Sequence, residues 1–213
     1  MTAILNTYGA LLIKAVYIHI IYVLISVFFG FIIGLVSGMA LSRLPKWSNV
    51  IIPILSVFQT IPGLVFIGML FLWLGMTPAT VIIALAIYAT FPVLKNTYTG
   101  ILEVDNKYID AARGCGMSNR QRLFKVELPL ALPTILAGLR MSAIYIVSWT
   151  VLAAMIGLGG LGDFVYQGVT SNNNTLILLG AIPSAVLAVL IGFIIDRLQK
   201  YIIPRGLRKE AAK

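Results

Sequence analysis

Few residue types in this 213-residue chain could support chemistry. Its one cysteine, Cys115, excludes an intramolecular disulfide, and its one histidine, His19, excludes a histidine-rich metal site. Residues 157–162 spell GLGGLG, a formal match to a dinucleotide-binding fingerprint. No strand pattern precedes this motif, and no acidic residue lies between Asp163 and Asp196 to hold a ribose, so we reject a nucleotide site there. We expect no metal ion and no cofactor.

Catalysis by this chain is not supported by its motifs either. It contains no GxxxxGK[ST] phosphate loop, so we do not expect it to bind and hydrolyse ATP by itself. Its seven Asp and Glu residues lie mostly in or beside predicted polar loops, and none is obviously buried in mid-span as a proton relay requires. The sequence therefore predicts a non-catalytic protein and disfavours an ion-coupled carrier.

One polar segment differs from the rest of the chain. Residues Asp110 to Pro129 read DAARGCGMSNRQRLFKVELP, whereas the surrounding sequence is almost entirely apolar. Within it, Ser118 is a candidate helix N-cap, and Gln121 three residues later completes a capping-box pattern. A polar segment with its own helix start is suited to contact another soluble protein.

The elements that position this segment must lie in a membrane. The chain is 60% hydrophobic and 11% charged, with a mean hydropathy of +0.98, which leaves too few polar residues to cover a soluble globule. A net charge of +9 is compatible with nucleic-acid binding, but the basic residues are distributed by loop and do not gather on one face. We therefore expect membrane lipid around the chain and no nucleic acid.

Five apolar runs are long enough to cross about 30 Å of hydrocarbon, which takes about 20 helical residues. The third run is short unless it continues towards Ile101, and the first begins near Ala10, which leaves room for an amphipathic lead-in helix. Five crossings are favoured over six. The predicted spans are residues 20–41, 51–74, 79–93, 134–155 and 176–195.

Charge predicts the orientation of these spans. If the Asp110–Pro129 segment is cytoplasmic, every Lys and Arg except Lys14 and Arg140 lies on the cytoplasmic side. Arg140 lies inside the fourth span, and its long side chain can reach the inner headgroups. The positive-inside rule then places the N-terminus outside and the C-terminus inside. We expect one membrane domain over residues 1–213, with a cytoplasmic loop at 96–133 and a basic cytoplasmic tail at 197–213.

Small residues and prolines predict how the spans pack. Gly30, Gly34 and Gly38 recur every four residues in the first span, a pattern that lets another helix approach closely. Packing within the chain is favoured over a contact between subunits. Each proline within a span removes a helical hydrogen bond and requires a bend or a new partner for the freed carbonyl. These prolines are Pro53, Pro62 and Pro92.

The polar segment also carries a family resemblance. The pattern Asp-Ala-Ala, three residues, Gly116, nine residues, Val-Glu-Leu-Pro resembles the EAA loop of ABC-importer permeases, with Asp110 for the usual Glu and Val126 for the usual Ile. Other segments resemble the osmoprotectant branch of that family, which carries glycine betaine, carnitine and choline. They are QTIPGL at 59–64, FPVLKNTYTGI at 91–101, LPLALPTILAGLR at 128–140, IGLGGLG at 156–162 and GAIPSAVLAVL at 180–190.

The resemblance implies an all-α membrane protein with the type I, methionine-permease-like fold and about five transmembrane helices, located in the cell membrane. It implies a permease dimer, identical or paralogous, with the solute passing along the interface. It also implies two partners, an ATP-binding cassette ATPase dimer and a separate extracellular or periplasmic solute-binding protein. A permease for another small solute such as methionine is the alternative within the family.

The resemblance further implies an ATPase-coupling surface. A short helix would hold the Asp-Ala-Ala motif, Gly116 would allow a turn, and the coupling helix would lie within residues 117–124. The small alanines fit contact with the ATPase and packing against the chain's own helices equally well. The expected coupling residues are Asp110, Ala111, Ala112, Gly116, Met117, Ser118, Arg120, Arg122, Leu123, Phe124, Leu128 and Pro129.

Aromatic spacing suggests a path for a quaternary ammonium solute. Such a cation cannot donate a hydrogen bond, but cation–π attraction to aromatic rings is worth roughly 0.5–2 kcal/mol. Tyr145 and Trp149 share a face of the fourth span, and Tyr88 and Phe91 share a face of the third. Together with Gln59, these residues form the expected substrate pathway. Core packing or lipid contact is the alternative for the aromatic residues.

Overall fold

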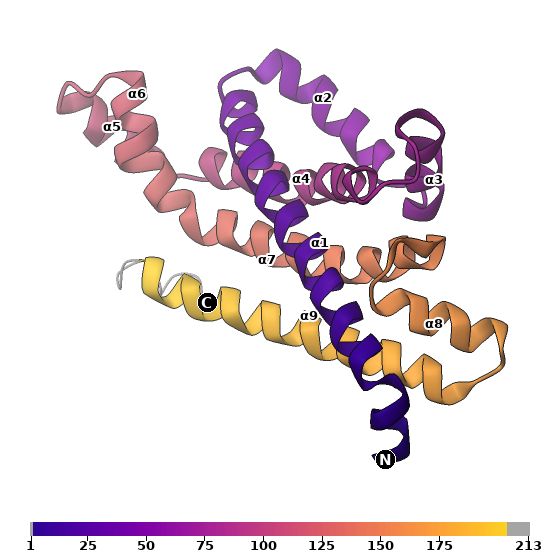
Figure 1. Ribbon diagram of the computed structural model, residues 1–213. Helices are drawn as coiled ribbons and strands as arrows, with labels where there is room; N and C mark the ends of the chain where they lie inside the picture. Colours follow the sequence, from indigo (N-terminus) through magenta and orange to yellow (C-terminus); the bar gives the residue numbers. More distant parts are fainter. Residues whose placement is uncertain (1, 204–213) are drawn as a thin grey trace.

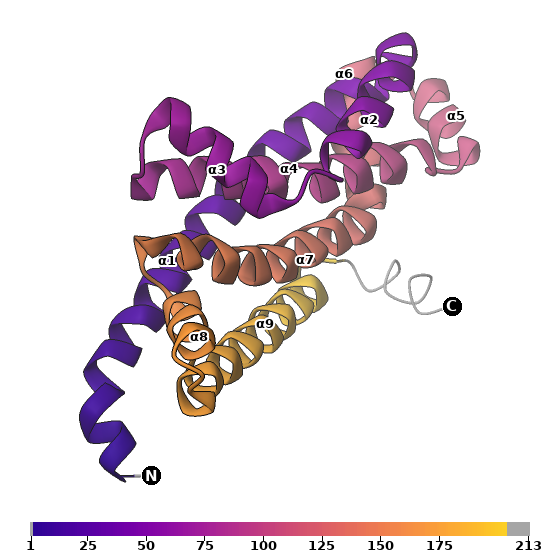
Figure 2. The same ribbon diagram turned by 90° about the vertical axis from the view of Figure 1, so that its right-hand side faces the viewer.

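The computed structural model describes residues 2–203, with side chains from residue 8 onward except those of Met155 and Ile156. Every regular element in this part of the chain is a helix (Figures 1 and 2), as the sequence predicts. The helices are α1 (Thr2–Ser42), α2 (Pro45–Phe58), α3 (Gly63–Leu74), α4 (Pro78–Leu102), α5 (Asn106–Gly114), α6 (Asn119–Arg122), η1 (Leu123–Glu127), α7 (Leu128–Ala153), η2 (Ala154–Leu158), α8 (Leu161–Thr170) and α9 (Asn174–Ile202). The predicted basic tail lies outside the described residues from position 204 onward.

Membrane spans follow the apolar runs closely. Four helical segments in the described chain are long and apolar enough to cross a membrane, and α2 and α3 together form a fifth span if the bent pair counts as one. The third predicted span continues through Lys95, because α4 ends only at Leu102. The room before the first span, where an amphipathic lead-in helix could lie, is occupied by α1 itself, which runs without interruption from Thr2 to Ser42. No proline interrupts that stretch of the sequence.

The second span is broken at Pro62, one of the prolines for which the sequence predicts a bend or a new hydrogen-bond partner. Residues 51–74 are apolar apart from a few positions such as Gln59 and Thr60, but α2 ends at Phe58, α3 begins at Gly63, and the two helices meet at 96°. Pro62 is the N-cap of α3 and has no backbone N–H to continue the α2 hydrogen-bond pattern. At the end of α2, the backbone N–H groups of Thr60 and Ile61 donate hydrogen bonds to the carbonyl oxygens of Val57 and Phe58, three residues earlier in each case. The proline therefore acts as a corner.

The glycine stripe on α1 packs against α4. A Cβ atom on Gly30 would lie 2.3 Å from Ala89 Cβ, and one on Gly34 would lie 2.6 Å from the carbonyl oxygen of Thr90. A Cβ on Gly38 would lie 2.7 Å from a carbonyl oxygen of the same helix. The favoured explanation, packing within the chain, is therefore confirmed, because the glycines allow the two helices to approach at backbone distance.

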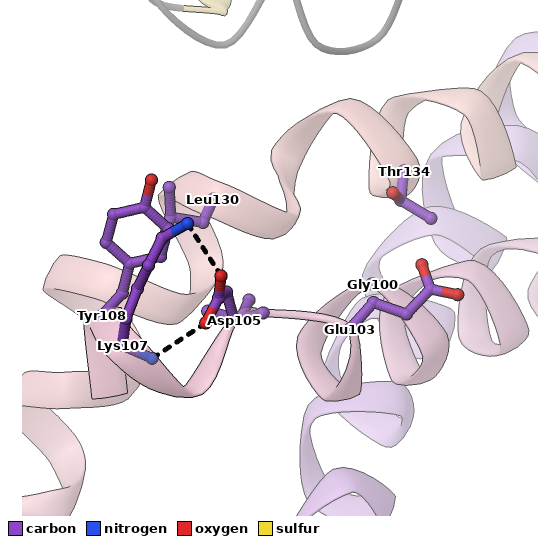
Figure 3. A pocket seen from close by; sticks show the side chains of 8 residues that line it. Gly100, Glu103, Asp105, Lys107, Tyr108, Leu130 and Thr134 are labelled. Atoms are coloured by element: carbon purple, nitrogen blue, oxygen red, sulfur yellow. Dashed lines mark hydrogen bonds and ion pairs between the residues drawn. The ribbon is translucent and has the colours of Figure 1, made fainter. Parts of the chain in front are cut away.

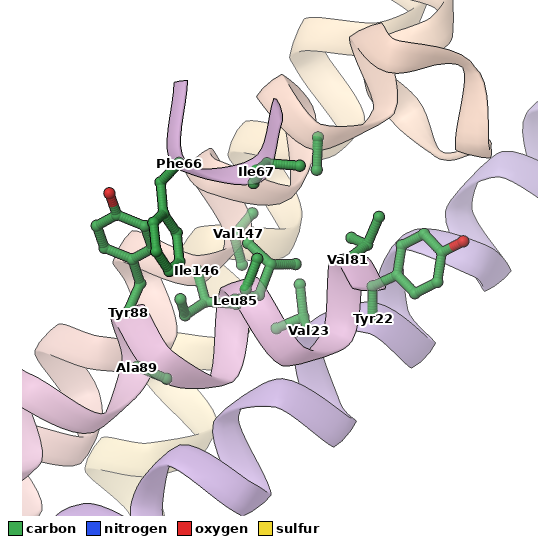
Figure 4. Packing of buried hydrophobic residues seen from close by; sticks show 12 residues of the cluster. Tyr22, Val23, Phe66, Ile67, Val81, Leu85, Tyr88, Ala89, Ile146 and Val147 are labelled. Carbon is green, nitrogen blue, oxygen red and sulfur yellow. The ribbon is translucent and has the colours of Figure 1, made fainter. Parts of the chain in front are cut away.

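Helix α4 lies in the core between α1 and α7. Ser26 on α1 donates a hydrogen bond to the Ile82 carbonyl at 3.2 Å, and Ser142 on α7 donates one to the Ala89 carbonyl at 2.8 Å. Figure 4 shows the apolar side chains that fill the space around α4. The buried core cluster comprises Tyr22, Val23, Phe66, Ile67, Val81, Ala84, Leu85, Tyr88, Ala89, Ile146, Val147 and Ala153.

Arg140 has a protein partner in the structure. Its Nε atom donates to Asp196 Oδ1 on α9 at 2.7 Å. Both side chains are half exposed in the isolated chain. Pairing offsets part of the cost of holding a charge within a membrane span.

Different helices lie at the two ends of the bundle. Helices α5 and α6 lie at one end together with the C-terminal ends of α1, α4 and α9 (Figures 1 and 2). Helices α3 and α8 and the beginning of α1 lie at the opposite end. This arrangement agrees with the predicted charge segregation.

Candidate coupling and translocation site

Helix α5 carries the Asp-Ala-Ala motif at the exposed end of the bundle. Asp105 caps its N-terminus by accepting hydrogen bonds from the backbone N–H of Lys107 at 2.9 Å and from its Nζ at 2.7 Å. These bonds, the side-chain bond first, hold the pKa of Asp105 below its usual range. Ala112 is buried, whereas Ala111 and Asp110 are exposed. The first alanine of the motif is therefore free for a partner, and the second packs against the chain.

Gly116 makes the turn that the sequence predicts. Its φ angle is +73°, a conformation that glycine adopts without steric cost. The backbone N–H of Gly116 bonds to the Arg113 carbonyl at 2.9 Å, and that of Met117 bonds to the Ala112 carbonyl at 3.1 Å. A Cβ atom at Gly116 would meet nothing within 4 Å. The turn therefore presents open backbone to the outside.

The predicted capping box is present at the start of α6. The Gln121 backbone N–H donates to Ser118 Oγ at 3.3 Å, and the Ser118 backbone N–H donates to Gln121 Oε1 at 2.8 Å. Arg120 is exposed, and the Phe124 side chain is 60% exposed. Leu123 instead packs against the buried cluster formed by Ile101, Ala131 and Ile135, as does Leu128. Met117 and Pro129 are half-buried. The segment is thus held on one side and exposed on the other.

Glu127 joins this segment to the distant end of α1, a role that sequence reasoning missed. Its side chain is 2% exposed and accepts a hydrogen bond from Arg122 Nε at 2.7 Å. It also forms an ion pair with Arg43, just after α1. Arg122, expected to meet the ATPase, is therefore engaged within the chain, with a side chain only 12% exposed. The available signal was a carboxylate between apolar Val126 and Leu128.

A cavity of about 320 Å³ separates α5 from the adjoining parts of α4 and α7. Figure 3 shows Asp105, Lys107 and Tyr108 on one side of it and Glu103 and Thr134 on the other. The Lys107 Nζ lies 4.9 Å from the centre of the Tyr108 ring. The Arg43–Glu127 ion pair joins the residue that follows α1 to the candidate coupling segment, residues 110–129.

Four of the five predicted pathway residues meet at one cavity of about 290 Å³, which Gln59, Tyr88, Tyr145 and Trp149 line with Ile146. Phe91 lines a neighbouring cavity of about 320 Å³, to which Gln59 and Tyr88 also contribute. The corner between α2 and α3 places Gln59 at both. The structure therefore brings all five residues to two adjoining cavities.

The aromatic rings differ in their availability to a solute. Tyr88 is buried, donates its hydroxyl hydrogen bond to the Ile61 carbonyl at 2.7 Å, and stacks on Trp149 with ring centres 4.8 Å apart. Gly63 lies against Trp149, since a Cβ there would fall 1.6 Å from Trp149 Cζ3. Tyr145, in contrast, is 51% exposed. Of the three aromatic residues at this cavity, Tyr145 is the most exposed.

The surroundings of this cavity are uncharged. No Asp, Glu, Lys or Arg is among the described residues that line either cavity. An amide, hydroxyls and aromatic rings can attract an ammonium group weakly without trapping it. Such a lining suits passage more than tight binding.

Comparison with known proteins identifies the family. Residues 26–208 match the family described as binding-protein-dependent transport system inner membrane component. The chain belongs to this family. A carnitine transport permease protein of Listeria monocytogenes is 39% identical to this chain over 90% of it and 88% of the relative. A choline transport system permease protein of Bacillus subtilis is 36% identical over 96% of this chain and 94% of the relative.

A solved structure of an ABC transporter contains a chain with the same fold as this permease. An inward-facing structure of the MetNI methionine ABC transporter matches with a TM-score of 0.82 and 26% identity, covering 93% of this chain and 99% of the other. The predicted methionine-permease-like fold is thereby confirmed, as is location in the inner, cytoplasmic membrane as a multi-pass protein. The relatives are permease subunits of ABC transporters, a family whose partners include an ATPase and a binding protein.

Proposed function

We propose that this permease moves quaternary ammonium osmoprotectants, namely glycine betaine, carnitine or choline, as a subunit of an ATP-driven importer. The observation that carries the proposal is the shared solute class of relatives that align along nearly their whole length. These are permeases named for carnitine, for choline and for glycine betaine/carnitine/choline, each covered over at least 88%. The uncharged, partly aromatic cavity at Tyr145 supports the same solute class.

Coupling to the ATPase runs through the exposed side of the α5–α6 segment. Arg120, Phe124 and the open turn at Gly116 form its accessible surface, and the Ser118 capping box fixes the direction of α6. Two such segments in a permease dimer, each bound to one ATPase subunit, would move together when ATP binds. The two membrane domains would then rock as rigid bodies between inward-facing and outward-facing states.

Methionine is the second candidate solute. The favouring observation is the structural match to a methionine transporter, with a TM-score of 0.82. Its 26% identity is lower than the 35–39% identity to the osmoprotectant permeases, so the latter assignment is preferred.

Co-purification tests the partner assignment. The permease, extracted gently from its native membrane, should bring down an ATPase that carries the GxxxxGK[ST] loop that this chain lacks. Crosslinking on intact cells should add an extracellular solute-binding protein. Solute uptake by the purified permease alone would contradict the proposal.

Cysteine labelling tests the orientation. In a Cys115→Ser background, Ser171→Cys should react with a membrane-impermeant maleimide from outside, and Asn119→Cys should react only after the membrane is opened. Both positions are exposed. Asn119 begins α6 and Ser171 follows α8, and these helices lie at opposite ends of the bundle (Figures 1 and 2). External labelling at Asn119 would reverse the orientation and remove the coupling argument.

Gly116→Asp should abolish uptake while leaving the permease in the membrane. The site is open, so the added carboxylate clashes with nothing in this chain, and aspartate tolerates positive φ better than most residues. Its bulk and charge would instead face the ATPase. ATPase retention in a pull-down and solute uptake are the measurements. Gly114→Asp, also in open space but without a positive φ, is the matched control. Full uptake by Gly116→Asp would exclude this turn from the coupling surface.

Tyr145→Leu should slow uptake of glycine betaine, carnitine and choline by roughly threefold to tenfold, the effect of losing one cation–π contact of about 0.7–1.4 kcal/mol. Tyr145→Phe keeps the ring and should stay within about twofold of wild type. Trp149→Leu should lower both uptake and stability, because Trp149 packs against Tyr88 and Gly63. Rates are measured in the reconstituted complex. A neutral Tyr145→Leu would remove the aromatic pathway from the proposal.

A further inference from the structure

A separate cavity lies at the end of the bundle opposite the coupling segment. It measures about 400 Å³, a size typical of small-molecule sites, and shares no lining residue with the pathway cavities. Its walls come from the first half of α1, from the glycine loop (residues 157–160) and from α8. Figure 2 shows where α1 and α8 lie in the fold. The lining residues are Tyr8, Leu11, Lys14, Ala15, Ile18, Gly157, Leu158, Gly159, Gly160, Asp163, Phe164 and Gln167.

Two opposite charges face this cavity without pairing. Lys14 on α1 and Asp163 on α8 both line it, yet no ion pair within 4.0 Å joins them in the part of the chain that the structure describes. Lys14 is also the basic residue that the charge pattern leaves at this end. Burial raises the pKa of Asp163, which means that its charged form lacks full solvation. A ligand that carries one positive and one negative charge would give both Asp163 and Lys14 an ion-pair partner.

Aromatic side chains also line the cavity. Tyr8 and Phe164 pack edge to face with ring centres 6.4 Å apart, and both belong to the lining together with Asp163. A carboxylate with aromatic rings is a favourable setting for a quaternary ammonium group. The GLGGLG motif contributes Gly157, Gly159 and Gly160 to the lining, and a Cβ on Gly159 would lie 3.2 Å from Ile18 Cδ1. Glycine therefore lets the loop backbone approach α1 closely.

We propose that this cavity binds zwitterionic quaternary ammonium solutes, those with a trimethylammonium group and a carboxylate, before they move into the membrane. Asp163, Tyr8 and Phe164 hold the cationic group, and Lys14 binds the carboxylate. The inference rests on the proposed function and deepens it. Glycine betaine and carnitine carry both charges, whereas choline lacks the carboxylate. Lys14 is therefore a residue that distinguishes the two kinds of solute.

The test compares uptake of the three labelled solutes by the reconstituted complex with solute-loaded binding protein in excess. Lys14→Gln should slow glycine betaine and carnitine by roughly tenfold, the effect of losing one charge-assisted hydrogen bond, and leave choline within about twofold. Asp163→Asn should slow all three. Lys14→Arg keeps the charge and should restore the zwitterion rates. Size-exclusion profiles of each variant complex check that it is assembled.

The outcomes separate the possible failures. Equal slowing of all three solutes by Lys14→Gln, with weaker docking of the binding protein, would make Lys14 a docking contact and overturn the site. Unchanged rates in Lys14→Gln and Asp163→Asn, with normal wild-type uptake, would overturn the site alone. If wild type carries none of the three solutes, the proposed function fails and the site with it.

Discussion

Glu127→Ala is expected to uncouple ATP hydrolysis from uptake. The buried carboxylate pairs with Arg122 beside α6 and with Arg43 at the end of α1. Its removal leaves two cations without their partner and costs about 3–5 kcal/mol, the range for breaking a buried ion pair. It also releases the coupling segment from α1. The complex should still hydrolyse ATP, while the amount of solute taken up per ATP falls by at least tenfold. A tenfold loss corresponds to a loss of roughly 1.4 kcal/mol in coupling free energy.

Two further variants separate coupling from stability. Glu103→Ala removes an exposed carboxylate from the same end of the bundle and should leave both uptake and stability unchanged. Replacing Glu127, Arg43 and Arg122 together by methionine removes every charge of the cluster, which often restores stability. That triple variant should melt near wild type yet remain uncoupled. Recovery of coupling together with stability would show that the cluster acts only in folding.

Gly63→Ala is expected to disrupt the pathway cavity and destabilise the permease. The new Cβ would lie 1.6 Å from Trp149 Cζ3, so the indole must move and its stack on Tyr88 must break. Forcing an extra carbon into a packed site costs about 1–3 kcal/mol, and so close a contact belongs at the upper end of that range. Thermal unfolding of the detergent-extracted protein and uptake should both decline.

The same helix offers a matched control for this substitution. Gly68→Ala on α3 adds the same methyl group where nothing lies within 4 Å, and it should be neutral or slightly stabilising. Adding Trp149→Phe to Gly63→Ala makes room for the methyl group and should recover part of the lost stability. If Gly63→Ala behaves like Gly68→Ala, the close approach of α3 to α7 is not as the structure has it.

Local signals in the sequence predicted local structure well. The Ser118 and Gln121 capping box and the Gly116 turn were predictable, because each depends on residues within a few positions. The Glu127 cluster was not, because its partner Arg43 lies 84 positions away and only the fold brings them together. A charge in an apolar stretch indicates that a partner is needed but not which one.

In the membrane core, too, local features were predictable from the sequence and long-range features were not. Helical spacing placed Tyr145 and Trp149 on one face, and the structure confirms their common cavity. The cavity itself depends on the 96° corner between α2 and α3, which the apolar run conceals. Pro62 signalled a break, but hydropathy carries no information on its angle. Likewise, hydropathy placed residues 156–175 between two spans without predicting that α8 forms there, although the preceding glycines mark its start.

ATP-driven uptake into sealed liposomes tests the central claim most directly. The permease is reconstituted with its co-purified ATPase, ATP is enclosed with the ATPase domains, and the binding protein and labelled glycine betaine are added outside. The proposed function predicts accumulation that requires both ATP and the ATPase and that unlabelled carnitine or choline inhibits, while methionine does not. Accumulation of methionine with no uptake of any quaternary ammonium solute, or uptake driven by an ion gradient without the ATPase, would contradict it.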